Sequence, residues 1–127
     1  MSSHLHLIIS AKENFKLSGI IRDFKKHTAV KIIERIKEEP ESRRALLLNQ
    51  FREEGKKDAR ITTYKFWQKS NHAIELERSQ IKIMDQKLNY IHRNPVEEGI
   101  VQYEKDYLYC SAKDYSDEKG LVEVSLL

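Results

Sequence analysis

Residues 17–38 read LSGIIRDFKKHTAVKIIERIKE, and this stretch predicts one long helix. A set of residues that is apolar except for one threonine recurs at three- and four-residue spacing, which places the set along one face of a helix. The helix should end at Glu39, because the residue before a proline such as Pro40 disfavours helical backbone angles. The stripe expected to face the core consists of Leu17, Ile20, Ile21, Phe24, Thr28, Ile32 and Ile36.

Two further helices are predicted downstream. Residues 41–54 carry an apolar side and stop at Gly55, which is suited to a helix C-terminal cap. Residues 81–94 carry a second apolar side and should be terminated by Pro95, and Gly99 then allows a turn. After that turn, residues 103–115 contain four tyrosines and are expected to wrap the domain, with a short helix near Ser111.

Short stretches of strand-like composition lie between these helices. Residues 4–10 are rich in Leu and Ile, residues 61–67 are β-branched and aromatic, and residues 73–76 resemble them. We therefore predict an α+β fold, in which a small antiparallel sheet is packed with helices. A chain of 127 residues with 39% apolar residues fits a single domain, residues 1–127, with residues 116–127 as a tail.

Composition narrows the class of protein. The single cysteine, Cys110, excludes an intramolecular disulfide and a cysteine-rich zinc site, and it favours the reducing cytoplasm. The N-terminal residues lack the basic region of a signal peptide, and no apolar stretch is long enough for a bilayer, so we expect no membrane partner. A net charge of +3 is compatible with a nucleic-acid partner but does not require one.

Two patterns can carry chemistry. His4 and His6 lie two apart in a predicted strand, so both imidazoles point to one face and can bind one metal ion. Lys87, Tyr90 and Asn94 are spaced by three and four, so they share one face of a helix.

A tyrosine on that helix face can be a nucleophile, with a cation one turn before it and an amide metal ligand one turn after it. Taken alone, each pattern also suits ordinary packing or surface roles. His92, two residues after Tyr90, is expected to be a surface histidine.

The order of these motifs along the chain is more specific. The His-Leu-His segment comes first, followed by a basic helix and then by residues 66–69, FWQK. Residues 90–101, YIHRNPVEEGIV, and residues 106–112, DYLYCSA, complete the series. Over residues 1–115 this order resembles the REP-associated tyrosine transposases, of the His-hydrophobic-His (HUH) single-tyrosine nuclease superfamily. Cys110 stands where the family pattern usually has a serine.

The resemblance implies a ferredoxin-like core and a DNA transposase that nicks and rejoins single-stranded hairpin DNA through a 5′-phosphotyrosine intermediate. It implies His4 and His6 as ligands of Mg²⁺ or Mn²⁺, Asn94 as the candidate third ligand, and Tyr90 as the nucleophile. The metal-polarised phosphate, Lys87 and a bound water are the three candidates for helping the tyrosine to lose its proton. Family members have several dozen residues before the His-hydrophobic-His strand, so this chain is expected to lack an N-terminal strand and helix. We expect the sheet edge exposed by that loss to be covered in a homodimer or by swapping an element.

The DNA partner is expected to contact a basic helix and loop, through phosphate-binding cations and base-stacking aromatic residues. Solvated side chains and a core tryptophan are the ordinary alternatives for these positions. Three other functions compete with the transposase: an inactive remnant that only binds hairpin DNA, a metal phosphoesterase that uses water, and a helical protein without a site. The DNA-contact candidates are Arg22, Lys25, Lys26, Lys56, Lys57, Arg60 and Trp67, with Phe66 beside it.

Overall fold

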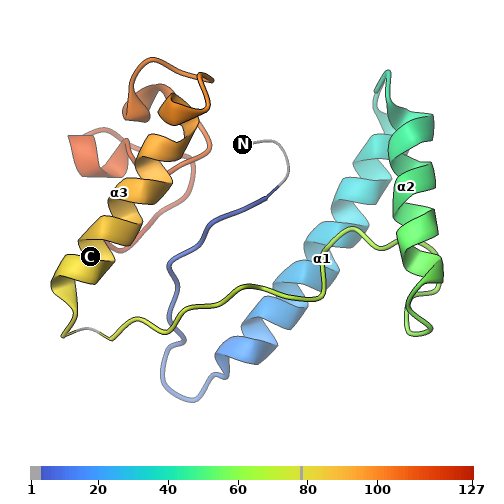
Figure 1. The fold of residues 1–127 in the computed structure, drawn as a ribbon, viewed down its shortest axis with the longest axis horizontal. Coiled ribbons are helices and arrows are strands. Elements are labelled where there is room, and N and C mark those ends of the chain that lie inside the picture. The colour runs from blue at the N-terminus through green and yellow to red at the C-terminus, as the bar shows by residue number, and fades with distance from the viewer. Residues whose placement is uncertain (1–3, 78) are drawn as a thin grey trace. The chain divides into compact units, whose positions relative to one another are not determined.

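The computed structural model describes residues 4–77 and 79–127. Its helices are α1 (Leu17–Glu38), α2 (Arg44–Lys56) and α3 (Ile81–Glu97), followed by the 3-10 turns η1 (Glu104–Asp106) and η2 (Asp114–Ser116) (Figure 1). The chain divides into two units: Ser10–Ala73, and Met1–Ile9 together with Ile74–Leu127. None of the helices in the described residues is long and apolar enough to cross a bilayer.

The predicted α+β fold is wrong, because the described residues form helices and no strand. Residues 4–10, 61–67 and 73–76 contain no strand and pair with no sheet. A high local β-propensity indicates that the side chains of a segment suit a pleated, half-buried surface. A sheet also requires a second backbone to pair with, which the composition of one segment does not provide. A ferredoxin-like core needs a sheet, so that expectation is wrong as well. An open sheet edge can no longer be used to argue for a homodimer.

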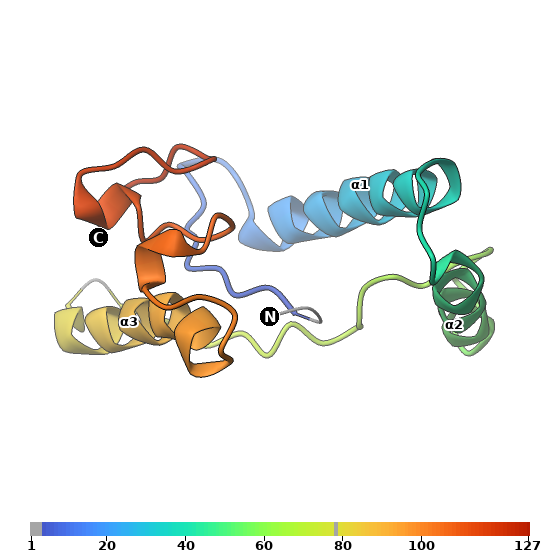
Figure 2. The same cartoon turned by 90° about the horizontal axis from the view of Figure 1, so that it is seen from above.

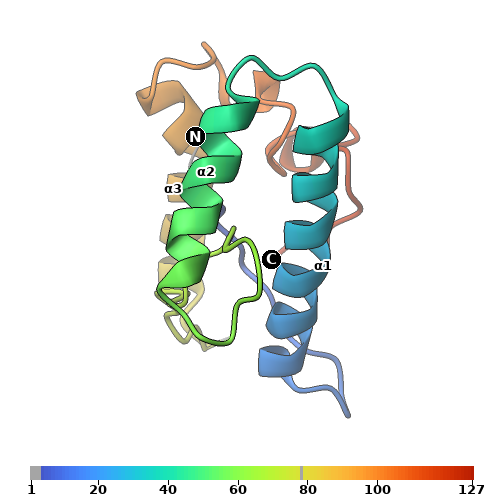
Figure 3. The same cartoon turned by 90° about the vertical axis from the view of Figure 1, so that its right-hand side faces the viewer.

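The unit Ser10–Ala73 is built on a helical hairpin, in which α2 runs back antiparallel to α1 (Figure 3). The predicted helix 17–38 matches α1 in both bounds. Arg44 closes the hairpin: its Nε donates to the carbonyl oxygen of Ile36 at 2.9 Å, and its guanidinium also bonds the carbonyl of Glu39. These bonds satisfy carbonyl groups that the end of α1 would otherwise leave open.

The buried side of α1 differs from the predicted stripe. Ile33 is the buried hydrophobic residue of this helix, whereas Ile20 and Phe24 remain more than a third exposed. Helix α1 packs on α2, and the segment after α2 contacts α1 through Trp67, Gln68 and Asn71. Ring contacts follow the same surface: Phe51 lies 5.2 Å from Phe66, and Phe24 lies 6.0 Å from Trp67.

Residues 61–67 bind the hairpin through side chains and one backbone bond. The Lys65 amide donates to the Phe51 carbonyl at 2.9 Å, and the Trp67 indole N–H donates to Thr28 Oγ1 at 2.9 Å. Gly55, predicted as a cap after the second helix, instead lies inside α2 and is buried. A Cβ there would lie 2.9 Å from the Thr63 carbonyl oxygen, so the close passage of this segment requires glycine.

In the unit that contains α3, Pro95 does not terminate the helix as predicted, because α3 continues to Glu97. Gly99, with a φ of 69°, then takes the left-handed conformation that ends many helices. Its amide donates to the Val96 carbonyl at 2.9 Å, and the Ile100 amide donates to the Pro95 carbonyl at 2.9 Å. This Schellman motif recovers carbonyl bonds and offsets the bond that the proline cannot donate.

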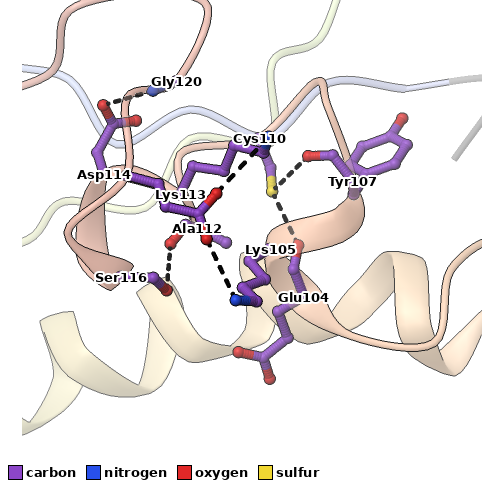
Figure 4. A network of polar contacts seen from close by, with 10 residues as sticks. Glu104, Lys105, Tyr107, Cys110, Ala112, Lys113, Asp114, Ser116 and Gly120 are labelled. Carbon is purple, nitrogen blue, oxygen red and sulfur yellow. Dashed lines mark hydrogen bonds and ion pairs between the residues drawn. The ribbon is translucent and has the colours of Figure 1, made fainter.

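The chain after α3 turns back onto this helix through η1 (Figure 2). A polar network then fixes its course (Figure 4). The Cys110 thiol contacts the Tyr107 carbonyl at 3.3 Å, and the Gly120 amide donates to Asp114 Oδ1 at 3.1 Å. Ala112 is buried to 3% exposure between these contacts, and the expected short helix near Ser111 forms three residues later, as η2.

Candidate metal and tyrosine site

His4 and His6 come from the extended segment at the start of the chain. Their ring centroids lie 4.9 Å apart, with the rings nearly perpendicular at 89°. Alternate residues of an extended backbone point to the same side even where no sheet forms. The pair therefore keeps the juxtaposition expected of it, although the segment contains no strand.

Tyr90 meets this pair from α3. Its ring centroid lies 5.5 Å from that of His6, in an edge-to-face arrangement at 81°. The residue is 52% exposed, so its hydroxyl can reach a bound macromolecule. Residues separated by more than eighty positions thus form one cluster, within a single unit of the chain.

One ring nitrogen of His6 determines whether this cluster can bind a metal ion. Its Nε2 is buried and has no hydrogen-bond partner among the described residues. Burial lowers the pKa of His6, and the charge of His4 lowers it further. The lowered pKa favours the neutral imidazole, which is the form that binds a metal ion.

The donor set suits a divalent cation with open coordination positions. Two imidazoles supply nitrogen ligands, and no cluster of three His, Cys, Asp or Glu side chains occurs in residues 4–77 and 79–127. Most of the coordination shell would therefore come from water or from oxygens of a ligand. A buried nitrogen without a partner, as in His6, is consistent with such an ion.

The remaining two predicted site residues flank Tyr90 on α3. Asn94, one turn later, is buried at 8% exposure, and Lys87, one turn earlier, is exposed. Within the described ranges, no hydrogen bond joins His6 to either side chain. The structure thus brings His4, His6 and Tyr90 together and leaves Asn94 and Lys87 as neighbours of Tyr90 along the helix.

His92 was expected at the surface, and this expectation is wrong, because it is 5% exposed. Its Nε2 lies 3.0 Å from Ser111 Oγ, and its ring contacts that of Tyr115 at 5.2 Å. Burial lowers its pKa, against a smaller raising effect of the Glu104 charge. The signal was present in the sequence, since His92 follows Leu88 by four residues and precedes Pro95 by three, which is the core spacing of α3.

The predicted DNA contacts all belong to the other unit, Ser10–Ala73. Four of the cations have an acidic partner nearby in sequence: Arg22 with Asp23, Lys56 with Glu53, Lys57 with Glu54, and Arg60 with Asp58. All eight residues lie within this unit. Exposed pairs of this kind contribute little and can be exchanged for a phosphate, so they remain candidates.

The other predicted contacts differ in how they are engaged. Lys25 donates to the Gln68 carbonyl at 2.6 Å and to Asn71 Oδ1 at 2.7 Å, whereas Lys26 has no ion pair in the described part of the chain. Trp67 is half-buried through its bond to Thr28 and its contacts with neighbouring rings. Its indole therefore packs against α1.

No family model, curated protein or solved structure matches this chain.

Proposed function

We propose that this chain is a metal-dependent, tyrosine-based DNA nuclease of the transposase type, acting in the cytoplasm on single-stranded or hairpin DNA. The observation that supports it best is the cluster of His4, His6 and Tyr90, in which a buried ring nitrogen without a partner among the described residues lies in a ring next to an exposed phenol. The order of motifs that resembles the REP-associated tyrosine transposases supports the same assignment.

In this proposal, His4 and His6 hold Mg²⁺ or Mn²⁺, and Asn94 is the candidate third ligand. The bound ion would polarise the scissile phosphate and neutralise its developing charge. His6 suits this role because its low pKa keeps the ring nitrogen available. Imidazole ligands favour Mn²⁺ over Mg²⁺ in affinity, while magnesium is the more available ion.

Tyr90 is the nucleophile in this proposal. The phenolic oxygen forms a bond to phosphorus, the bond from phosphorus to the 3′-oxygen breaks, and that oxygen leaves as a 3′-hydroxyl after taking up a proton. The proton of the Tyr90 hydroxyl must leave as the bond to phosphorus forms, and Lys87 one turn earlier can stabilise the developing phenolate. The 5′-phosphotyrosine retains the bond energy, which permits rejoining without a nucleotide cofactor.

The decisive experiment is a covalent-adduct assay with 5′- and 3′-labelled hairpin DNA and Mn²⁺. The wild-type chain should give a denaturation-resistant protein–DNA band, and both Tyr90→Phe and His6→Ala should abolish it. Tyr103→Phe is the matched control, because Tyr103 is similarly exposed but lies outside the cluster. An adduct that persists in Tyr90→Phe would refute the assigned nucleophile.

The same assay separates the competing functions. Cleavage without any adduct, unchanged in Tyr90→Phe, would indicate a phosphoesterase that uses water. Salt-sensitive binding without cleavage would indicate an inactive domain that only binds hairpin DNA. Neither binding nor cleavage would leave a helical protein without a nucleic-acid function.

A further inference from the structure

A pair of cations in the unit Ser10–Ala73 surrounds one aromatic ring. Lys37 Nζ lies 4.9 Å from the ring centroid of Tyr64, and the guanidinium carbon of Arg52 lies 5.7 Å from it. Arg52 also donates to the Tyr64 hydroxyl at 3.3 Å. Lys37 lies on α1, Arg52 on α2 and Tyr64 on the segment that follows, so the fold assembles this group from three places.

In the part of the chain that the structure describes, the pair lacks the carboxylate partner that several other cations of this unit have. Lys31, Arg35, Lys56 and Lys57 each have a carboxylate partner, and the described residues offer none to Lys37 or Arg52. The charge of Lys37 lowers the pKa of Glu34, but the hydrogen bond that Lys31 donates to Glu34 at 2.9 Å lowers that pKa more. Two positive charges thus lie near one ring, and neither forms an ion pair within the described residues.

Such an arrangement suits a phosphate. An arginine presents a planar fork that matches two phosphate oxygens, and a lysine adds a point charge. The half-buried ring of Tyr64 attracts both cations through its face and hydroxyl, so they are partly ordered before a ligand arrives. Ordering in advance reduces the entropy that binding would otherwise cost.

We propose that Lys37 and Arg52 form a phosphate-binding pair for single-stranded nucleic acid, with Tyr64 as the residue that positions them. The choice of nucleic acid over other phosphate ligands rests on the proposed function, whereas the paired cations stand on their own geometry. The competing role for the trio is a purely structural one, in which the two cations pin residues 61–67 to the helices.

The test is a salt titration of binding to a fluorescein-labelled single-stranded oligonucleotide, read by anisotropy. Lys37→Gln/Arg52→Gln should weaken binding roughly tenfold at low salt and reduce the slope of log K against log salt by about 1.4, the value for two lost phosphate contacts. The matched control is Lys31→Gln/Arg35→Gln, which removes the same charge from residues that already have acidic partners. It should change affinity less than threefold.

Two results would overturn the pair: wild-type affinity in the Lys37/Arg52 variant, or equal losses in both double variants. Lys37→Arg/Arg52→Lys keeps both charges and guards against a folding defect. It should melt like the wild-type chain and recover most of the binding, whereas a lowered melting temperature together with a loss of affinity would support the structural role instead.

The adduct assay on the same samples separates this inference from the proposed function. An active wild-type chain whose Lys37/Arg52 variant still binds normally would refute the pair alone. A chain that binds through the pair but never forms an adduct would refute the nuclease alone. A wild-type chain without affinity for the oligonucleotide would refute the pair as a nucleic-acid site.

Discussion

His92 Nε2 and Ser111 Oγ lie 3.0 Å apart, and this bond ties the C-terminal segment to the helix that carries Tyr90. Ser111→Ala should lower the free energy of unfolding by about 1 kcal/mol, because it leaves the buried imidazole without its partner. His92→Ala should cost about 2–3 kcal/mol, since it also removes a packed ring. Chemical denaturation of both single variants and the double variant would give a coupling energy, and additive losses would contradict the bond.

Stability should fall as the pH drops below about 6.5. Burial lowers the pKa of both His92 and His6 in the folded chain, so the unfolded chain binds protons first as the pH decreases. The stabilisation is complete above the unfolded value of about 6.5 and is lost as the pH falls toward the lowered folded values. Thermal melts from pH 7.5 to 5 should show this loss reduced in His92→Gln, and a slope unchanged from wild type would be incompatible with it.

Two glycines of the helical hairpin should respond oppositely to the same substitution. Gly55→Ala brings a methyl group to 2.9 Å from the backbone carbonyl of Thr63, so it should destabilise the chain by about 1–2 kcal/mol despite the better helix propensity of alanine. Gly19→Ala meets nothing within 4 Å and should stabilise it by about 0.5–1 kcal/mol. Urea titrations of the two variants compare them directly, and a stable Gly55→Ala chain would argue against the close passage.

A divalent metal should stabilise the folded chain through His4 and His6. A ligand that binds only the folded state raises stability by about 2.7 kcal/mol at one hundred times its dissociation constant. Mn²⁺ should therefore raise the melting temperature, and EDTA should reverse the rise. His6→Ala should abolish the effect and His27→Ala, an exposed histidine of α1, should preserve it. A metal response that survives in His6→Ala would place the ion elsewhere.

The hydrogen bond between Trp67 and Thr28 allows a spectroscopic test of packing in the unit Ser10–Ala73. Trp67 is the chain's one tryptophan, so tryptophan emission reports on the surroundings of this indole, which include Thr28. Thr28→Val removes the acceptor of the indole N–H, which should cost about 1 kcal/mol and shift the emission maximum. The Thr28→Ser variant retains the hydroxyl and should keep the wild-type spectrum. Strong quenching by single-stranded DNA would show that bases nevertheless reach the indole.

Local pattern was sufficient for the presence of the three helices and for the bounds of α1, and insufficient for the rest of the fold. The apolar spacing and Pro40 gave the bounds of α1, because both act through neighbouring residues. Pro95 was misleading, since bonds from Gly99 and Ile100 extend α3 past it. The segments expected as strands have suitable compositions, but a strand exists only where another backbone lies alongside to pair with it.

The candidate site, like the fold, could be predicted only in part from the sequence. Two histidines at alternate positions and a tyrosine at helical spacing from Lys87 and Asn94 can be read from the chain, because extended and helical backbones have fixed periods. The 5.5 Å approach of Tyr90 to His6, the burial of His92 and the gathering of Lys37 and Arg52 around Tyr64 could not be read there. Sequence by itself determined where the helices lie and which residue types can perform chemistry, since those depend on near neighbours. Tertiary structure alone decided which side chains meet, because burial and ring contacts join residues that are distant along the chain.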